Sequence, residues 1–318
     1  MTRFILGRTG FLVLAWVLAS VLIFATLRIL PGDVAQVMGG TKASPDEVAA
    51  LREALGLNRP LLAQYVEWIG GVLRFDLGTS VLTGVEISHQ LAEKAEVTIP
   101  LTLMSLAVVL LVAIPLGVFA AYRHGTRIGQ LVSASSVLAS AIPVVWAGLL
   151  GTLLLSSWLG WLPSQGFPQD GWKEPLDAVR SLVLPALTIG LIEGAILFRL
   201  VRSATLRALD ADHVRTAMSQ GNSRLRALLT QGLPGVGLSI VSMLGLQAAA
   251  LLVGAVVVEQ LFSLPGLGTM LVSDVNERDL PKVQSTLLVL TSVILIMGAL
   301  VDVIHRLIDP RLRAEGEE

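Results

Sequence analysis

The chain contains no cysteine and little charge. Only 15% of its 318 residues are Asp, Glu, Lys or Arg, whereas soluble domains average about 25%, and 53% are hydrophobic. The absence of cysteine excludes disulfides, thiol catalysis and cysteine metal sites. A formal net charge of −1 provides no global field that would indicate a nucleic-acid partner. This composition indicates an all-α polytopic membrane protein.

Motifs for nucleotide and hydrolytic chemistry are also missing. The sequence contains no G-x-x-x-x-G-K-[ST], the loop that cradles ATP phosphates, and neither H-E-x-x-H nor G-x-S-x-G. The histidines stand singly, without metal-ligand spacing, at His89, His124, His213 and His305. We therefore expect no catalytic residue, no metal site and no cofactor bound by this chain.

Six apolar runs approach or exceed the length of about 20 residues that a membrane-spanning helix needs. They cover residues 9–27, 97–122, 128–158, 181–199, 227–258 and 283–301. The first run is longer than the apolar core of a signal peptide and is followed by a poor cleavage site, so we expect a retained helix. Proline residues that can kink helices lie in three runs, at Pro115, Pro143 and Pro185.

The segment between the first two spans has a different composition. It mixes charge, glycine and proline and contains no spanning run. Ser44, Pro45 and Glu47 form a capping box that predicts a short helix, which Gly56 would end. Further helices are expected from Leu61 and from Val85. We thus divide the chain into a first transmembrane helix (1–30), an extracytoplasmic helical segment (31–96), a core of five spans (97–305) and a tail (306–318).

Basic residues are distributed unevenly between the two sides of these spans. Thirteen of the 23 Lys and Arg residues lie near the N-terminus, at 123–127, at 199–226 and in the tail, whereas most acidic residues lie in the alternate segments. Because cytoplasmic segments carry an excess of Lys and Arg, both termini and the loop at 202–234 are expected in the cytoplasm.

The longest polar interruption in the second half of the chain covers residues 210–234. Asp210 or Asp212 can cap a short helix, and Gly221 would end it. Its apolar stripe would contain Ala211, Val214 and Met218. Together with small Ala217, this pattern favours a surface helix that docks against another protein. The alternative is a solvated basic loop held by lipid headgroups.

Two polar side chains lie inside the predicted spans. Glu193 is an acid well within a span, where a charge costs about 2.5–3.5 kcal/mol on insertion scales, so it should face the helix bundle or a partner. It is either part of a translocation path or a structural contact between helices. Gln247, in the middle of the fifth run, favours an interhelical hydrogen bond over a ligand contact.

Residues 215–234 resemble the cytoplasmic coupling loop of ABC-transporter permeases. The family motif begins with Glu-Ala-Ala, and Arg215, Thr216 and Ala217 occupy those positions here. Gly221, Leu233 and Pro234 match in register, whereas Arg215 departs from the glutamate and Gln231 from an apolar position. The resemblance implies that the contacts to an ATPase are made by Asp212, His213, Arg215, Thr216, Ala217, Gly221 and Pro234.

Other segments resemble the first permease of dipeptide, oligopeptide and nickel importers. They are residues 54–80, 114–122, 159–167, 184–190, 256–268 and 309–313. The resemblance covers nearly the full length and implies the six-helix fold of type I ABC importer permeases. It also implies a location in the bacterial inner membrane and a mechanism of alternating access.

The resemblance further implies the partners and the cargo. The partners would be a homologous second permease, two ATPase subunits or domains that bind ATP and Mg, and an extracytoplasmic solute-binding protein. Di- or oligopeptides are the commonest cargo, with nickel or another small solute as alternatives. A six-span membrane enzyme or scaffold and a secondary transporter are the other classes. The first lacks a catalytic constellation here, and the second favours several intramembrane charges, of which only Glu193 is clear.

Overall fold

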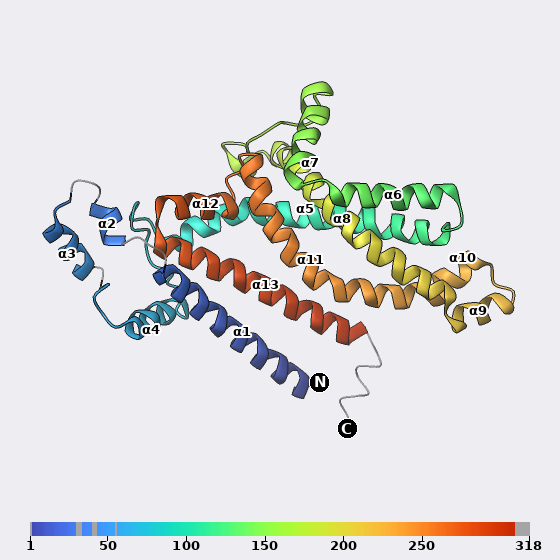
Figure 1. Ribbon diagram of the computed structural model, residues 1–318, viewed down its shortest axis with the longest axis horizontal. Helices are drawn as coiled ribbons and strands as arrows, with labels where there is room; N and C mark the ends of the chain where they lie inside the picture. Colours follow the sequence, from blue (N-terminus) through green and yellow to red (C-terminus); the bar gives the residue numbers. More distant parts are fainter. Residues whose placement is uncertain (1, 30–33, 40–42, 55, 309–318) are drawn as a thin grey trace. The chain divides into compact units, whose positions relative to one another are not determined.

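The computed structural model describes residues 2–29, 34–39, 43–54 and 56–308 (Figure 1). Within these ranges the regular secondary structure is helical apart from one isolated β-bridge, and turns and loops connect the helices. The helices are α1 (Thr2–Ile29), α2 (Val34–Gly39), α3 (Pro45–Ala54), α4 (Leu61–Val72), α5 (Ile87–Tyr122), α6 (Arg127–Ala141), α7 (Val144–Gly151), α8 (Pro175–Asp210), α9 (Asp212–Ser219), α10 (Arg224–Ala227), α11 (Leu233–Leu261), α12 (Leu267–Glu277) and α13 (Leu280–Ile308). Short π-helical segments follow α7 (Thr152–Trp158) and α10 (Leu228–Gly232), and a 3-10 turn (Gly171–Lys173) precedes α8. The predicted all-α class is confirmed. The motif at 309–313 and most of the predicted tail lie outside the described residues.

Five helical segments are long and apolar enough to cross a membrane, and a sixth is obtained if one bent pair counts as a single span. The five lie in α1, α5, α8, α10 with α11, and α13. They correspond to five of the six predicted runs, and most extend beyond the predicted limits. The predicted assignment of the remaining segments to the extracytoplasmic and cytoplasmic sides stays a prediction.

The predicted third span is broken rather than continuous. The sequence predicts one helix over residues 128–158, but α6 ends at Ala141 and α7 begins at Val144, and the two helices meet at 105°. Ile142 has an extended backbone with ψ of 124°, as expected for a residue that precedes proline. By contrast, Pro115 and Pro185 remain within α5 and α8.

Contacts divide the chain into two compact units. The first contains Met1–Ile5, Ile99–Leu264 and Ile296–Glu318, and the second contains Leu6–Thr98 and Pro265–Leu295. The long helices α5 and α13 each contribute to both units. Both candidate sites described below lie in the first unit.

Helix α8 is the centre of the first unit, where it contacts α6, α7 and α11. It approaches α5 closely through Gly190 and Gly194, which are four residues apart. A Cβ atom at Gly190 would lie 2.6 Å from Val108, so only glycine fits there. Small residues at this spacing allow the backbones of two membrane helices to pack closely.

The second unit contains the predicted outer helices and their contacts with α1. Ser44 and Glu47 form the predicted reciprocal capping box, with hydrogen bonds of 2.7 and 3.3 Å. Gly56 has a φ of +64° and follows α3, as expected for a helix stop. Tyr65 of α4 shares a hydrogen bond of 2.8 Å with Ser20 of α1, so α4 is attached to the first span.

A buried ion pair joins α12 to α13 in the same unit. Lys282 Nζ lies 2.8 Å from Asp274 Oδ1, and both side chains are largely buried. The Asp279 carboxylate accepts hydrogen bonds from the Ser80 hydroxyl and from the backbone N–H of Lys282 in the first turn of α13. These contacts connect the turn between α12 and α13 to Ser80 and to the first turn of α13.

Candidate functional site

The two polar residues predicted within the spans contact one another. Gln247 Nε2 on α11 donates a hydrogen bond of 2.8 Å to Glu193 Oε2 on α8. Both residues lie near the middle of their helices. Gln247 is buried and Glu193 is half-buried. The prediction that Gln247 makes an interhelical hydrogen bond is confirmed, and its partner is the acid that the sequence singled out separately.

Close packing of α8 against α11 allows this short contact. A Cβ atom at Gly254 of α11 would lie 3.4 Å from Ile189 of α8. Ala248, the residue that follows Gln247 in α11, is also buried. Small side chains on α11 thus allow the two backbones to approach within the reach of one amide and one carboxylate.

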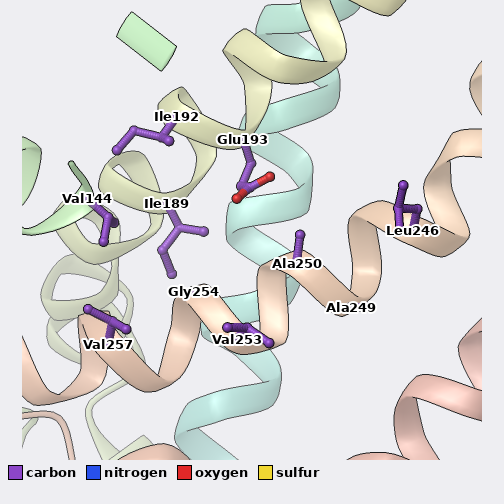
Figure 2. A pocket seen from close by; sticks show the side chains of 10 residues that line it. All are labelled: Val144, Ile189, Ile192, Glu193, Leu246, Ala249, Ala250, Val253, Gly254 and Val257. Atoms are coloured by element: carbon purple, nitrogen blue, oxygen red, sulfur yellow. The ribbon is translucent and has the colours of Figure 1, made fainter. Parts of the chain in front are cut away.

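A cavity of about 510 Å³ opens beside this pair, a volume within the range of small-molecule sites. Its lining residues are Val144, Ile189, Ile192, Glu193, Leu246, Ala249, Ala250, Val253, Gly254 and Val257. Figure 2 shows the Glu193 carboxylate reaching from α8 toward Ala250 on α11. Among these ten residues Glu193 alone has a polar side chain, so one acid lies in an aliphatic wall.

The predicted surface helix is present as α9, and its end has the predicted geometry. Gly221 has a φ of +92°. Its N–H bonds the carbonyl of Met218 at 3.0 Å, and the N–H of Asn222 bonds the carbonyl of Ala217 at 3.2 Å. These two bonds define a Schellman motif, in which glycine is favoured at the left-handed position.

The predicted start of this helix is wrong in one respect. Ala211 occupies the N-cap position, and no side chain caps the helix. Asp210 instead lies 3.6 Å from Arg215 in an exposed ion pair. Asp212 is in the first turn, where its charge is favourable to the helix dipole.

The structure places Ala217 inside the loop rather than on its surface. Its side chain is only 7% exposed and packs with Val214 and Ala227, with Met218 beside them. The remaining predicted coupling residues are exposed: Asp212, His213, Arg215, Thr216, Gly221 and Pro234. A partner that docks on this loop would therefore meet a polar face, while Ala217 supports that face from within.

Contacts that sequence reasoning missed hold the loop against the spans. The Arg224 guanidinium lies 5.5 Å from the ring centroid of Tyr122, at the end of α5. Ser223 caps α10 by accepting a hydrogen bond from the N–H of Arg226. A serine before a short helix is an N-cap signal that the sequence offered. The stacking of Arg224 on Tyr122 has no local signal, because about 100 residues separate them.

These features define a class of protein. The chain is a multi-spanning helical membrane protein with an acid in a pocket between two spans and a short packed helix at the ends of the same spans (Figure 1). Residues 113–314 match the family described as "Binding-protein-dependent transport system inner membrane component". Residues 1–102 match the N-terminal region of such membrane components. The chain belongs to this family of inner-membrane transport components.

Curated relatives match almost from end to end. A putative peptide transport system permease protein of Brucella abortus (strain 2308) is 37% identical over 313 residues, which cover 98% of this chain and 99% of the relative. The dipeptide transport system permease protein DppB of Escherichia coli (strain K12) is 31% identical over 336 residues, with the same coverage. A probable peptide ABC transporter permease protein of Sinorhizobium fredii (strain NBRC 101917 / NGR234) is 32% identical over 310 residues.

Family membership confirms the predicted resemblance and decides between the classes of function. The chain is the non-catalytic permease component of a binding-protein-dependent ABC importer and is a multi-pass protein of the inner membrane. The readings as a membrane enzyme and as a secondary transporter are therefore set aside.

Proposed function

We propose that this chain carries di- or oligopeptides across the membrane together with a homologous second permease. Relatives that are 31–37% identical over nearly the whole chain are described as permeases of peptide or dipeptide transport systems, which supports peptides over nickel. An extracytoplasmic binding protein would deliver the peptide, and alternating access would release it into the cytoplasm.

The translocation path is proposed to pass the cavity between α8 and α11. The single observation that carries this is the half-buried Glu193 carboxylate at the middle of a span, with Gln247 beside it. Such a charge facing lipid costs about 2.5–3.5 kcal/mol on insertion scales, so this face is expected to meet water or the second permease.

The exposed face of α9 is proposed to bind one of two ATPase subunits or domains. Four exposed side chains form it: Asp212, His213, Arg215 and Thr216. Gly221 and Pro234 shape the ends of the loop, and Ala217 acts through internal packing. ATP and Mg would be bound by the ATPases, and both termini of this chain would be cytoplasmic.

An uptake assay tests the cargo. In cells that lack the chromosomal copy of this chain, uptake of a radiolabelled dipeptide is expected to be lost and to return with the parent chain. Radioactive nickel, measured in the same cells, is expected to be unaffected. If nickel uptake is lost and restored in this way while dipeptide uptake is unaffected, the cargo is nickel rather than a peptide.

A further inference from the structure

The Glu193 carboxylate has one oxygen that the chain leaves available. Gln247 occupies Oε2, whereas Oε1 accepts no hydrogen bond from any described residue. Within the described ranges no Lys, Arg or His side chain lies in an ion pair with Glu193 either. The carboxylate therefore offers an acceptor to whatever enters the cavity.

The walls of the cavity determine what kind of ligand suits that acceptor. Ile189 and Val253 lie on opposite helices near Glu193 (Figure 2), and the rest of the lining is also aliphatic or glycine. Aliphatic walls lower the local dielectric, so a single fixed charge attracts an opposite charge more strongly than it would in water. A positively charged group attached to an apolar body matches both parts of this surface.

We propose that Glu193 binds the ammonium group of a peptide in transit, its N-terminal amine above all, while the peptide's apolar side chains contact the aliphatic walls. This inference rests on the proposed peptide function and names the chemical group that the path recognises. An N–H⁺···O⁻ hydrogen bond to Oε1 is the charge-assisted type, which is stronger than a neutral one.

Gln247 acts as a positioning residue in this proposal. Its amide donates to Oε2 and so holds the carboxylate across the α8–α11 contact. Replacing it with leucine would remove this hydrogen bond and leave the carboxylate present but free to rotate. Such a variant should weaken the attraction of cations partially, whereas loss of the carboxylate should abolish it.

Because the chain has no cysteine, one introduced thiol can report on the cavity. Ala250→Cys places it opposite Glu193 (Figure 2). In the assembled transporter in lipid nanodiscs, we expect a cationic methanethiosulfonate reagent to react about tenfold faster than an anionic one of similar size, relative to their rates with a free thiol. Glu193→Gln should remove this preference, Glu193→Asp should retain it, and Gln247→Leu should reduce it several-fold.

A second measurement tests the ammonium group itself. A dipeptide with a free amine should slow labelling at Ala250→Cys several-fold more than its N-acetylated form, and Glu193→Gln should make the two equal. Retention of the ATPase in a pull-down checks that each variant assembles.

The outcomes separate this inference from the proposed function. An unchanged reagent preference in assembled Glu193→Gln, or equal protection by both peptides in the parent, would overturn the inference even where dipeptide uptake is normal. Protection by nickel ion but not by dipeptide would also overturn it. A Glu193-dependent preference in a chain that does not support dipeptide uptake would support a cation site and refute the peptide function.

Discussion

The buried pair formed by Asp274 and Lys282 offers a sharp test of the fold of the second unit. Lys282 Nζ lies 2.8 Å from Asp274 Oδ1, and the two side chains are 11% and 3% exposed. Asp274 Oδ2 has no hydrogen bond within the described part of the chain. Lys282→Met keeps most of the apolar stem but leaves the carboxylate buried without a counter-charge. Removing one partner of a buried pair costs about 3–5 kcal/mol, and we expect a loss of this size in the free energy of unfolding.

The same substitution should make stability depend on pH. Burial raises the pKa of Asp274 above its ordinary value of 3.8, and the Lys282 ammonium opposes part of that rise. Without Lys282 the folded-state pKa should rise further. A carboxyl with a raised folded-state pKa contributes stability below its unfolded pKa and loses it as the pH rises through the folded pKa. The deficit of Lys282→Met should therefore be smaller at about pH 5 than at about pH 8.

Titration of the detergent-solubilised chain with SDS, followed by circular dichroism at both pH values, measures these changes. Lys173→Met is the matched control, because its pair with Asp170 is 82% and 70% exposed and should contribute at most about 1 kcal/mol. The double variant Asp274→Leu with Lys282→Met should recover much of the loss. A deficit for Lys282→Met no larger than that of the control, and independent of pH, would refute the reasoning.

Four further predictions concern coupling and topology. Thr216→Arg, on the exposed face of α9, should abolish dipeptide uptake and retention of the ATPase in a pull-down while leaving the chain inserted; normal values for both would contradict docking at this face. Gly221→Val places a β-branched residue at a φ of +92°, which should cost about 1–3 kcal/mol and lower uptake, whereas full uptake would show that the loop tolerates another backbone path. Thiols introduced by Ala50→Cys or Gln169→Cys should react with an impermeant reagent outside intact cells, and one from Asn222→Cys only after permeabilisation; outside labelling at Asn222 would invert the topology. The purified chain alone should hydrolyse no ATP, and hydrolysis should appear with its ATPase partners.

A further prediction concerns Asn222→Ala, at the position that follows Gly221. Asn222 Nδ2 donates a hydrogen bond of 3.1 Å to the carbonyl of Ala217, which also accepts the Asn222 backbone N–H. Losing the side-chain bond should cost about 0.5–1.5 kcal/mol in the loop, visible as faster amide exchange in α9 than in the parent.

Helix ends and spanning helices were predicted from residues that lie close together in the sequence. The capping box at Ser44 and Glu47 and the left-handed stop at Gly221 depend on residues within a few positions of each other, and both are present. Apolar runs likewise predict spanning helices because membrane insertion responds to a continuous stretch of side chains. The sequence shows a proline, Pro143, at the break between α6 and α7. It does not show the angle of 105° between them, because a proline is compatible with anything from a kink to a full turn.

The tertiary structure decided which of these residues meet. The sequence identified Glu193 and Gln247 as polar residues within spans, but their hydrogen bond depends on how α8 packs against α11 across 54 positions of sequence. It also identified Ala217 as a small residue, and only packing against Ala227 places that methyl inside the loop instead of at a partner's surface. Hydrophobic periodicity records how apolar a face is and carries no information about which other segment covers it. The membrane protein and its helices are therefore readable from local chemistry, whereas the aliphatic cavity that contains Glu193 and the burial of Ala217 beneath the polar face of α9 arise from the packing of separate segments.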